Sequence, residues 1–293
     1  MTVGDVSSTE ALVWTRADAP GDVTLEVSSQ SHFPAGAVTT YAGTARRASD
    51  NTITIRVSGL TPGSRYFYRF RRPGGTSVVG QFETAPKPSQ TRTITFAYSG
   101  DADAQPAKGQ TKPFFNHFQA YAQMAREGND FNINLGDTIY SDSLVQSTAP
   151  HGVLHLAFPP ALSRKAKWAK YRMNLGLFNL RRVRRSAAMY DQWDDHEFVN
   201  DFTPAEMGQK LYRAGRDAFR DYMPAPYSKE DGIYRTVRWG KNVQLFFPDE
   251  RSFRSAKASA HHVCDNPQTH QPDVAPTLPP SKRALFSVLV PQL

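Results

Sequence analysis

Residues 131–142 read FNINLGDTIYSD. Their first part is an apolar run that predicts a buried strand, and a turn with acidic side chains follows it directly. Upstream, the apolar run Thr93–Tyr98 also precedes an acidic turn, and Phe114–Glu127 between the two runs has the periodicity of an amphipathic helix. This order predicts a strand–helix–strand unit. A right-handed crossover makes its strands parallel, so that their carboxyl ends open on one edge of a sheet. The residues that follow those strand ends form a candidate site.

The preceding part of the chain, residues 11–82, contains short β-branched or alternating runs separated by turn residues, which is typical of an antiparallel β-sandwich. Within it, Leu60–Tyr66 resembles the tyrosine corner of fibronectin-III-like domains, where a phenol ties a strand to the preceding turn. The proline-bearing stretch Ala85–Gln90 is a predicted linker. We therefore expect an all-β fibronectin-III-like sandwich over residues 1–86 and an α/β domain over residues 91–293, each with its own core. The predicted strands of the sandwich are Ala11–Trp14, Val23–Val27, Thr52–Val57, Tyr66–Phe70 and Val78–Phe82.

Further elements are predicted downstream. Ala161–Asp191 has the composition of one or two helices, and Thr203–Tyr222 that of another helix, with Thr203 as its N-cap. Gly232–Phe247 is predicted to form a hairpin that feeds a central strand. The polar, proline-rich stretch Ser255–Ser281 is a predicted extended loop.

Composition limits the class of protein. The chain has 293 residues, 39% of them hydrophobic, and no stretch approaches the roughly 20 apolar residues of a membrane span. A net charge of +8 favours encounter with anions such as phosphoesters. The single Cys264 cannot form an internal disulfide. The residues after Met1 lack the basic, apolar and small-residue regions that follow one another in a signal peptide. The apolar run Ala284–Pro291 at the end leads us to expect a truncated sequence.

Three acidic clusters carry the candidate chemistry, and each follows an apolar element. They are Ser99–Asp103, Gly136–Asp142 and Trp193–Glu197. Carboxylates that converge on one edge repel each other unless cations neutralise them. Hard metal ions held by oxygen and imidazole ligands are therefore the economical explanation.

The stretch Gly136–Tyr140 and the run Trp193–Glu197, in this order and separation, resemble the signature of PhoD-type alkaline phosphatases and phosphodiesterases of the calcineurin-like metallophosphatase superfamily. The closing Phe82–Pro86 of the sandwich and the later Asp249–Arg254 follow the same layout, so the similarity covers essentially the whole chain. It implies a four-layer α/β/β/α sandwich, incomplete here at the C-terminus. It also implies hydrolysis of phosphomonoesters or phosphodiesters by a metal-bound hydroxide, without a covalent enzyme intermediate.

The resemblance also implies ligands for a binuclear or multinuclear centre of Fe³⁺ and Ca²⁺, or of other divalent metals. Asp137 would bridge two metals, Tyr140 would be a phenolate ligand of iron, and Asp195 would bind the second metal. Asp101 would bind the first metal, although well-known members carry a cysteine at this place, which makes the site harder here. His196 would stabilise charge on the phosphoryl group or protonate the leaving group.

Other interpretations of these residues stay open. The Gly136–Asp137 turn could be a simple helix cap, and His196 could cap a helix that ends near Asp191. The four arginines between 181 and 185 could attract phosphate or form a solvated helix face, which we prefer. Arg251 and Arg254 could clamp phosphate or pair with Asp249. A zinc site at His151 and His155 is not expected, and His261 and His262 are expected to be solvated.

Two rival functions remain. One is a binding or surface protein whose second domain has lost its metals, and the other is a nuclease of the same superfamily. Phosphoester substrates are the expected partners, with no stable nucleic-acid or membrane partner. The resemblance alone places the protein outside the cytoplasm, in the periplasm or secreted. Because the family draws further ligands from later elements, we also expect this chain to be inactive or unstable by itself.

Overall fold

The structure, a computed structural model, describes residues 1–106, 110, 112–114, 117–142, 145–146, 154–155, 160–255, 265–266 and 271–272. The two-residue pairs β11 (Val145–Gln146) with β12 (Leu154–His155) and β16 (Asp265–Asn266) with β17 (Gln271–Pro272) are described only as backbone pairing. The predictions for Cys264, the end of the chain, His151, the side chain of His155, the His261–His262 pair and most of the Ser255–Ser281 loop fall outside the described residues.

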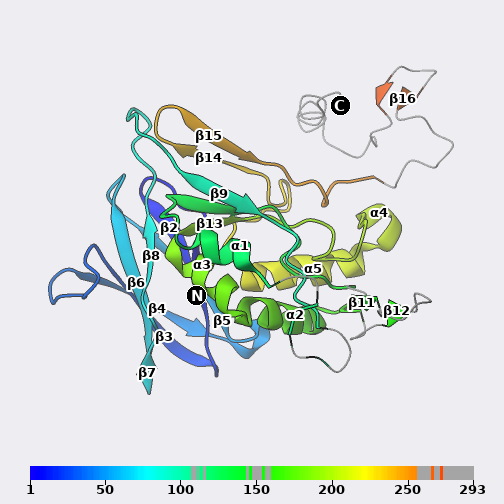
Figure 1. Cartoon of the computed structure of the whole chain (residues 1–293), viewed down its shortest axis with the longest axis horizontal. Helices are drawn as coiled ribbons and strands as arrows, with labels where there is room; N and C mark the ends of the chain where they lie inside the picture. The colour runs from blue at the N-terminus through cyan, green and yellow to red at the C-terminus, as the bar shows by residue number, and fades with distance from the viewer. Residues whose placement is uncertain are drawn as a thin grey trace.

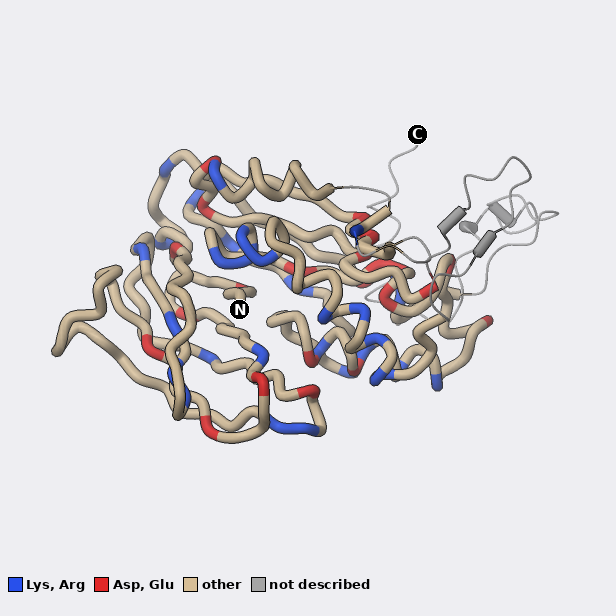
Figure 2. Tube along the Cα trace, turned by 60° about the horizontal axis from the view of Figure 1, so that its bottom comes forward, with Lys and Arg blue, Asp and Glu red and all other residues tan. Residues whose placement is uncertain are grey.

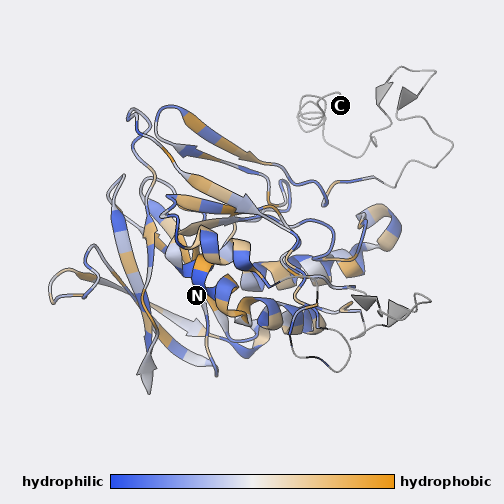
Figure 3. Cartoon of the chain, in the orientation of Figure 1, coloured by the Kyte–Doolittle hydropathy of each residue, from blue (hydrophilic) through white to orange (hydrophobic). Residues whose placement is uncertain are grey.

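The N-terminal part is a β-sandwich, as predicted (Figure 1). One sheet has the order β4-β3-β6-β7, with β8 also paired to β6, and β1, β2 and β5 lie in the other sheet. Hydrophilic and hydrophobic residues alternate along several of these strands (Figure 3). The tyrosine corner is present, because the Tyr66 hydroxyl accepts a hydrogen bond from the Thr61 amide at 2.9 Å. The strands are β1 (Thr2–Gly4), β2 (Glu10–Arg16), β3 (Gly21–Ser28), β4 (Val38–Ala45), β5 (Thr52–Ser58), β6 (Arg65–Arg72), β7 (Gly75–Thr76) and β8 (Gly80–Glu83), and a short 3-10 turn, η1 (Arg47–Ser49), precedes β5.

The second sheet of the sandwich continues into the α/β part. Its strand order is β5-β2-β1-β13-β10-β9, where β9 is Phe96–Ser99, β10 is Phe131–Asn134 and β13 is Ala188–Asp191. β10 pairs in parallel with both β9 and β13, which confirms the predicted parallel unit. β13 also pairs in parallel with β1, where Gly4 lies opposite Met189. The prediction of helix up to Asp191 is therefore wrong over its last four residues, which form a central strand.

The core crosses the predicted domain boundary in the same way. A single buried cluster joins sandwich residues such as Val13 and Val57 to Phe131 and Tyr190 of the parallel strands. The sandwich therefore shares this core with the α/β part, whereas a further cluster around Tyr121 and Leu180 lies within the α/β part alone. The β1–β13 pairing joins the strands of both parts edge to edge in one sheet, so that their apolar faces continue one another.

Helices cover one face of the parallel strands and a hairpin covers the other (Figure 1). The hairpin, β14 (Arg235–Trp239) and β15 (Val243–Phe247), packs through Trp239 on Phe131, with ring centroids 4.6 Å apart. The predicted hairpin over Gly232–Phe247 is confirmed, and within the described residues β15 pairs with β14 alone, so it is not a central strand there. Hairpin, sheet and helices make three of the four predicted layers.

The helices differ in length from the predicted segments. They are α1 (Gln119–Met124), α2 (Arg164–Gly176), α3 (Phe178–Ser186), α4 (Pro204–Met207) and α5 (Gln209–Tyr222). Thr203 is an N-cap, as predicted, because its side chain accepts a hydrogen bond from the Glu206 amide. No helix in the described part of the chain is both long enough and apolar enough to span a bilayer.

Candidate metal centre

Three loops leave the carboxyl ends of β9, β10 and β13 on one edge of the sheet. We call residues 100–106 the first loop, 135–142 the second loop and 192–203 the third loop. Figure 2 shows several Asp and Glu residues close together on the side of the α/β part that faces away from the sandwich. The three acidic clusters of the sequence therefore meet at this edge.

The second and third loops approach each other closely at Gly136. Its φ is +114°, and a side chain there would bring a Cβ atom within 2.6 Å of the Asp194 nitrogen, so glycine is required. Asp101 and Asp137 also have left-handed backbone, with φ of 54° and 52°. Aspartate is one of the few side chains that adopt this conformation readily. The sharp turns at the strand ends thus explain the residue types found there.

Glu197 holds the second and third loops together from inside the protein. Its carboxylate is fully buried and accepts hydrogen bonds from the amides of Asp137 at 3.0 Å, Thr138 at 2.7 Å and Asp194 at 2.9 Å. Burial, together with the charge of Asp137, raises the pKa of Glu197 to about 8, against the effect of these three hydrogen bonds. Glu197 ends the Trp193–Glu197 run, but no role for this side chain follows from the sequence. Its position shows that it organises the two loops.

Asp137, Asp195 and His196 form the group best placed to hold a cation. One potential ligand atom from each lies within 4.8 Å of the others, and the two aspartates are only 6% and 7% exposed. Burial and the charges of Asp194 and Asp195 raise the pKa of Asp137 to about 7, although the positive charge of His196 opposes the shift. Buried carboxylates that repel each other in this way fit a hard cation, which would relieve the repulsion.

Asp142 holds the ring of His196. The histidine Nδ1 lies 2.7 Å from Oδ1 of Asp142, and the other carboxylate oxygen accepts a hydrogen bond from the Asn200 amide. Burial alone would lower the pKa of His196, but the Asp142 bond and the charges of Asp137, Asp142 and Asp195 raise it to about 9. The alternative that His196 caps a helix ending near Asp191 is wrong, because the preceding element is the strand β13. Nothing in the sequence indicated this partner for the histidine.

Tyr140 connects His196 to the first loop. Its ring stacks on the His196 ring, with centroids 4.1 Å apart, and its hydroxyl donates to Oδ1 of Asp101 at 2.8 Å. Burial and this bond raise the pKa of the phenol, so the proton stays on Tyr140 unless a cation displaces it. Asp101 itself is exposed and lies beside Tyr140 rather than within the Asp137 group.

Arg251 reaches the cluster from the segment that follows β15. Its Nε lies 2.5 Å from Asp194, and a terminal nitrogen lies 3.7 Å from Asp195. The side chain therefore pairs with the third loop, and the suggested ion pair with Asp249 is not formed. Asp249 instead accepts hydrogen bonds from its own loop, including the Ser252 amide at 2.9 Å, and from the Trp193 ring at 3.0 Å.

The arginines of α3 have different surroundings. Arg184 is buried and forms a double hydrogen bond with Asp191, so it belongs neither to a solvated face nor to a phosphate site. Arg182 and Arg185 line a surface cavity beside Phe67 and Gln81 of the sandwich.

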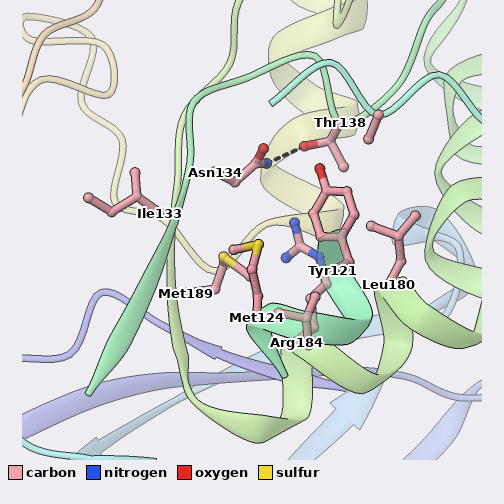
Figure 4. Close-up of a pocket in the computed structure, with 10 residues that line it drawn as sticks. Tyr121, Met124, Ile133, Asn134, Thr138, Leu180, Arg184 and Met189 are labelled. Carbon is pink, nitrogen blue, oxygen red and sulfur yellow. Dashed lines mark hydrogen bonds between the residues drawn. The ribbon is translucent and has the colours of Figure 1, made fainter. Parts of the chain in front are cut away.

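A small apolar pocket lies under the second loop, between α1, α3 and the sheet (Figure 4). At its rim the Asn134 amide donates to the hydroxyl of Thr138, the bond drawn in Figure 4, and to Asp191 at 3.1 Å. These bonds anchor the start of the second loop to the end of β13.

Comparison with known proteins agrees with this arrangement. A sequence model described as PhoD-like phosphatase matches residues 106–278, and one described as PhoD-like phosphatase, N-terminal domain, matches residues 1–86. Alkaline phosphatase D of Bacillus subtilis (strain 168) is 25% identical over 286 residues, which cover 87% of this chain and 47% of that protein. The chain thus spans about half the length of this curated relative.

Two solved structures are similar in fold. A structure of PhoD, 21% identical, superposes with a TM-score of 0.74 over 88% of this chain and 52% of the other. A purple acid phosphatase from seeds of yellow lupin (Lupinus luteus), 14% identical, has a TM-score of 0.58 over 87% of this chain and 45% of its own. The chain therefore has a metallophosphatase-like fold with a β-rich N-terminal region.

Proposed function

Because the chain belongs to the PhoD-like phosphatase family, we propose that it hydrolyses phosphoric esters at the centre formed by the first, second and third loops. The single observation that carries this proposal is the convergence of Asp137, Asp195 and His196, whose potential ligand atoms lie within 4.8 Å of one another. The activity is proposed for the protein as a whole, because the curated relative is about twice as long as this chain.

An excess of carboxylates supports a centre that binds cations. The three loops carry eight carboxylates, and the side-chain cations from α2 and the segment after β15 number three. Cations bound among these loops would reduce the repulsion between the carboxylates. The carboxylates are those of Asp101, Asp103, Asp137, Asp142, Asp194, Asp195, Glu197 and Asp201, and the cations are Lys167, Lys170 and Arg251.

Within this proposal each side chain has a distinct task. Asp137 would bridge two cations, Asp195 would bind one of them, and Tyr140 and Asp101 would bind the other. Cations bound there would polarise a phosphoryl oxygen and supply a nucleophile from water. Fe³⁺ and Ca²⁺ are the proposed metals. The phenol of Tyr140 favours iron, and the oxygen-rich donor set is suited to a hard ion such as Ca²⁺.

His196 and Arg251 would act on the substrate. His196, held through Nδ1 by Asp142, has Nε2 left to protonate a leaving oxygen or to donate to the phosphoryl group. One terminal nitrogen of Arg251 is buried without a hydrogen-bond partner in the described part of the chain. A phosphate oxygen would satisfy this donor, which supports Arg251 as a substrate-binding residue.

Metal content and hydrolysis of chromogenic esters test the proposal together. We expect the whole protein, once purified, to contain bound metal by elemental analysis. It should hydrolyse p-nitrophenyl phosphate or bis(p-nitrophenyl) phosphate, lose this activity on chelation and regain it when metal is returned. A metal-free protein without hydrolysis would favour the rival binding function. Faster cleavage of DNA than of the small esters would instead favour the nuclease.

A further inference from the structure

The face of α2 that points into the protein is polar, which is unusual for a buried helix face. Lys167 is completely buried, and Lys170 and Asn174 are 7% and 1% exposed. The spacing i, i+3, i+7 places all three on one side of the helix. Burial of two amines and an amide is costly unless each has good hydrogen-bond partners. The identity of those partners therefore shows what this face does.

Lys167 joins the second loop to the third. Its Nζ donates to the hydroxyl of Ser141 at 2.7 Å and to the carbonyl oxygen of Phe198 at 2.7 Å. Ser141 directly follows Tyr140, and Phe198 directly follows Glu197. A single buried amine thus contacts the chain beside a candidate ligand and beside the carboxylate that organises the two loops.

Lys170 and Asn174 act on the first and second loops. Lys170 donates to the side-chain oxygen of Gln105, in the first loop. Asn174 donates to the carbonyl oxygens of Ala102 and Thr138 through the same amide nitrogen. Ala102 follows Asp101 and Thr138 follows Asp137. Two of the backbone groups that α2 holds therefore lie next to a proposed metal ligand.

We propose that Lys167, Lys170 and Asn174 are positioning residues of the metal centre. This inference rests on the proposed function, because it assigns to α2 the task of holding the three ligand loops at the spacing that cations require. None of the three side chains needs to touch metal or substrate. Residues of this kind contact the ligands or their loops but not the metal. Their loss typically weakens metal affinity by about 10- to 100-fold.

The test is the metal affinity of the folded protein. It is measured by calorimetric titration of the metal-free protein, prepared with a chelator, with Mn²⁺ and, separately, with Ca²⁺. Asn174→Asp keeps the side-chain size but removes both donated hydrogen bonds. Lys170→Met removes the amine that donates to Gln105 in the first loop. We expect each variant to bind more weakly by about 10- to 100-fold. Lys170→Arg, which keeps donors, should recover part of the loss. Lys165→Met, at an exposed position of the same helix, is the matched control and should bind like the parent.

Circular dichroism and thermal unfolding separate positioning from general stability. A variant with a lowered melting temperature but unchanged metal affinity when folded would overturn the inference. If Asn174→Asp does not fold, the comparison of Lys170→Met with Lys170→Arg still decides. Failure of the unsubstituted protein to bind either metal would refute the metal centre itself, and with it this inference. Binding by the parent with unchanged affinity in all variants would refute only the role of α2.

Discussion

The ring of His196 is held by the carboxylate of Asp142, whose Oδ1 lies 2.7 Å from the histidine Nδ1. The carboxylate both orients the ring and favours its protonated form. We therefore expect Asp142→Asn to lower the turnover number by about 10- to 100-fold, as for other carboxylate partners of functional histidines.

The same substitution should change the pH dependence of hydrolysis. A general acid acts in its protonated form, so the rate falls as pH rises through the pKa of His196. Loss of the Asp142 charge and hydrogen bond lowers that pKa, which should move the alkaline limb of the rate profile to lower pH. Asp18→Asn, at an exposed position of the sandwich, is the control. An alkaline limb at the same pH in Asp142→Asn and the parent would show that this limb does not report His196.

His196→Asn should keep its metal and lose rate. The proposed task of the ring is proton donation or charge stabilisation, which is typically worth about 10²- to 10⁴-fold. Elemental analysis and hydrolysis of bis(p-nitrophenyl) phosphate on the same sample measure both quantities. Because His196 lies within ligand distance of Asp137 and Asp195, loss of metal in this variant would make it a ligand instead.

Asp137→Asn should remove both activity and most of the bound metal. An amide is a poor bridge between two cations. The carboxylate of Asp137 is held in the cluster, because its Oδ1 accepts a hydrogen bond from the His196 amide at 3.1 Å. Asp142→Asn provides the comparison, since it should reduce the rate with metal retained. Equal loss of metal in the two variants would contradict the bridging role.

If iron binds through Tyr140, the purified protein should have a visible phenolate-to-iron absorption band that disappears in Tyr140→Phe. The phenol now donates to Asp101, so binding of iron would require loss of that proton. The colour should therefore appear only when bound iron has displaced the proton of the Tyr140 phenol. An active protein without colour would indicate divalent metals other than iron at this position.

The buried amine of Lys167 should make the free energy of unfolding depend on pH. Burial lowers its pKa to about 7, even though the charges of Asp142 and Glu197 favour the protonated form. Between that pH and the unfolded value of 10.5 the unfolded chain binds more protons than the folded chain. The free energy of unfolding should therefore rise with pH in this window, by up to about 1.4 kcal/mol per pH unit from this group.

Urea unfolding of the metal-free protein at about pH 7.5 and about pH 9 measures this slope. Lys167→Met removes the titrating group, so the slope should decrease by up to the same amount, whatever the change in absolute stability. Lys165→Met should retain the parent slope. The same slope in Lys167→Met and the parent would mean that the amine stays protonated in the folded protein throughout this range.

Much of the site could be predicted because its ligands are local to strand ends. Asp137 and Tyr140 follow the apolar run of β10 directly, and parallel strands place their carboxyl ends on one edge whatever the details of packing. The short run Ala188–Asp191 was missed for the opposite reason. It follows a helix with no turn residue between them, and only its hydrogen bonds to β10 and β1 make it a strand.

The sequence by itself determined the parallel unit of β9 and β10, the residue types at the strand ends and hence their preference for hard cations. The tertiary structure alone decided which side chains became partners: Asp142 with His196, Arg251 with Asp194, and the polar face of α2 with the three loops. Periodicity and turn chemistry act over a few residues. These pairs join residues 26 to 72 positions apart, and their geometry depends on how helices and loops pack on the sheet.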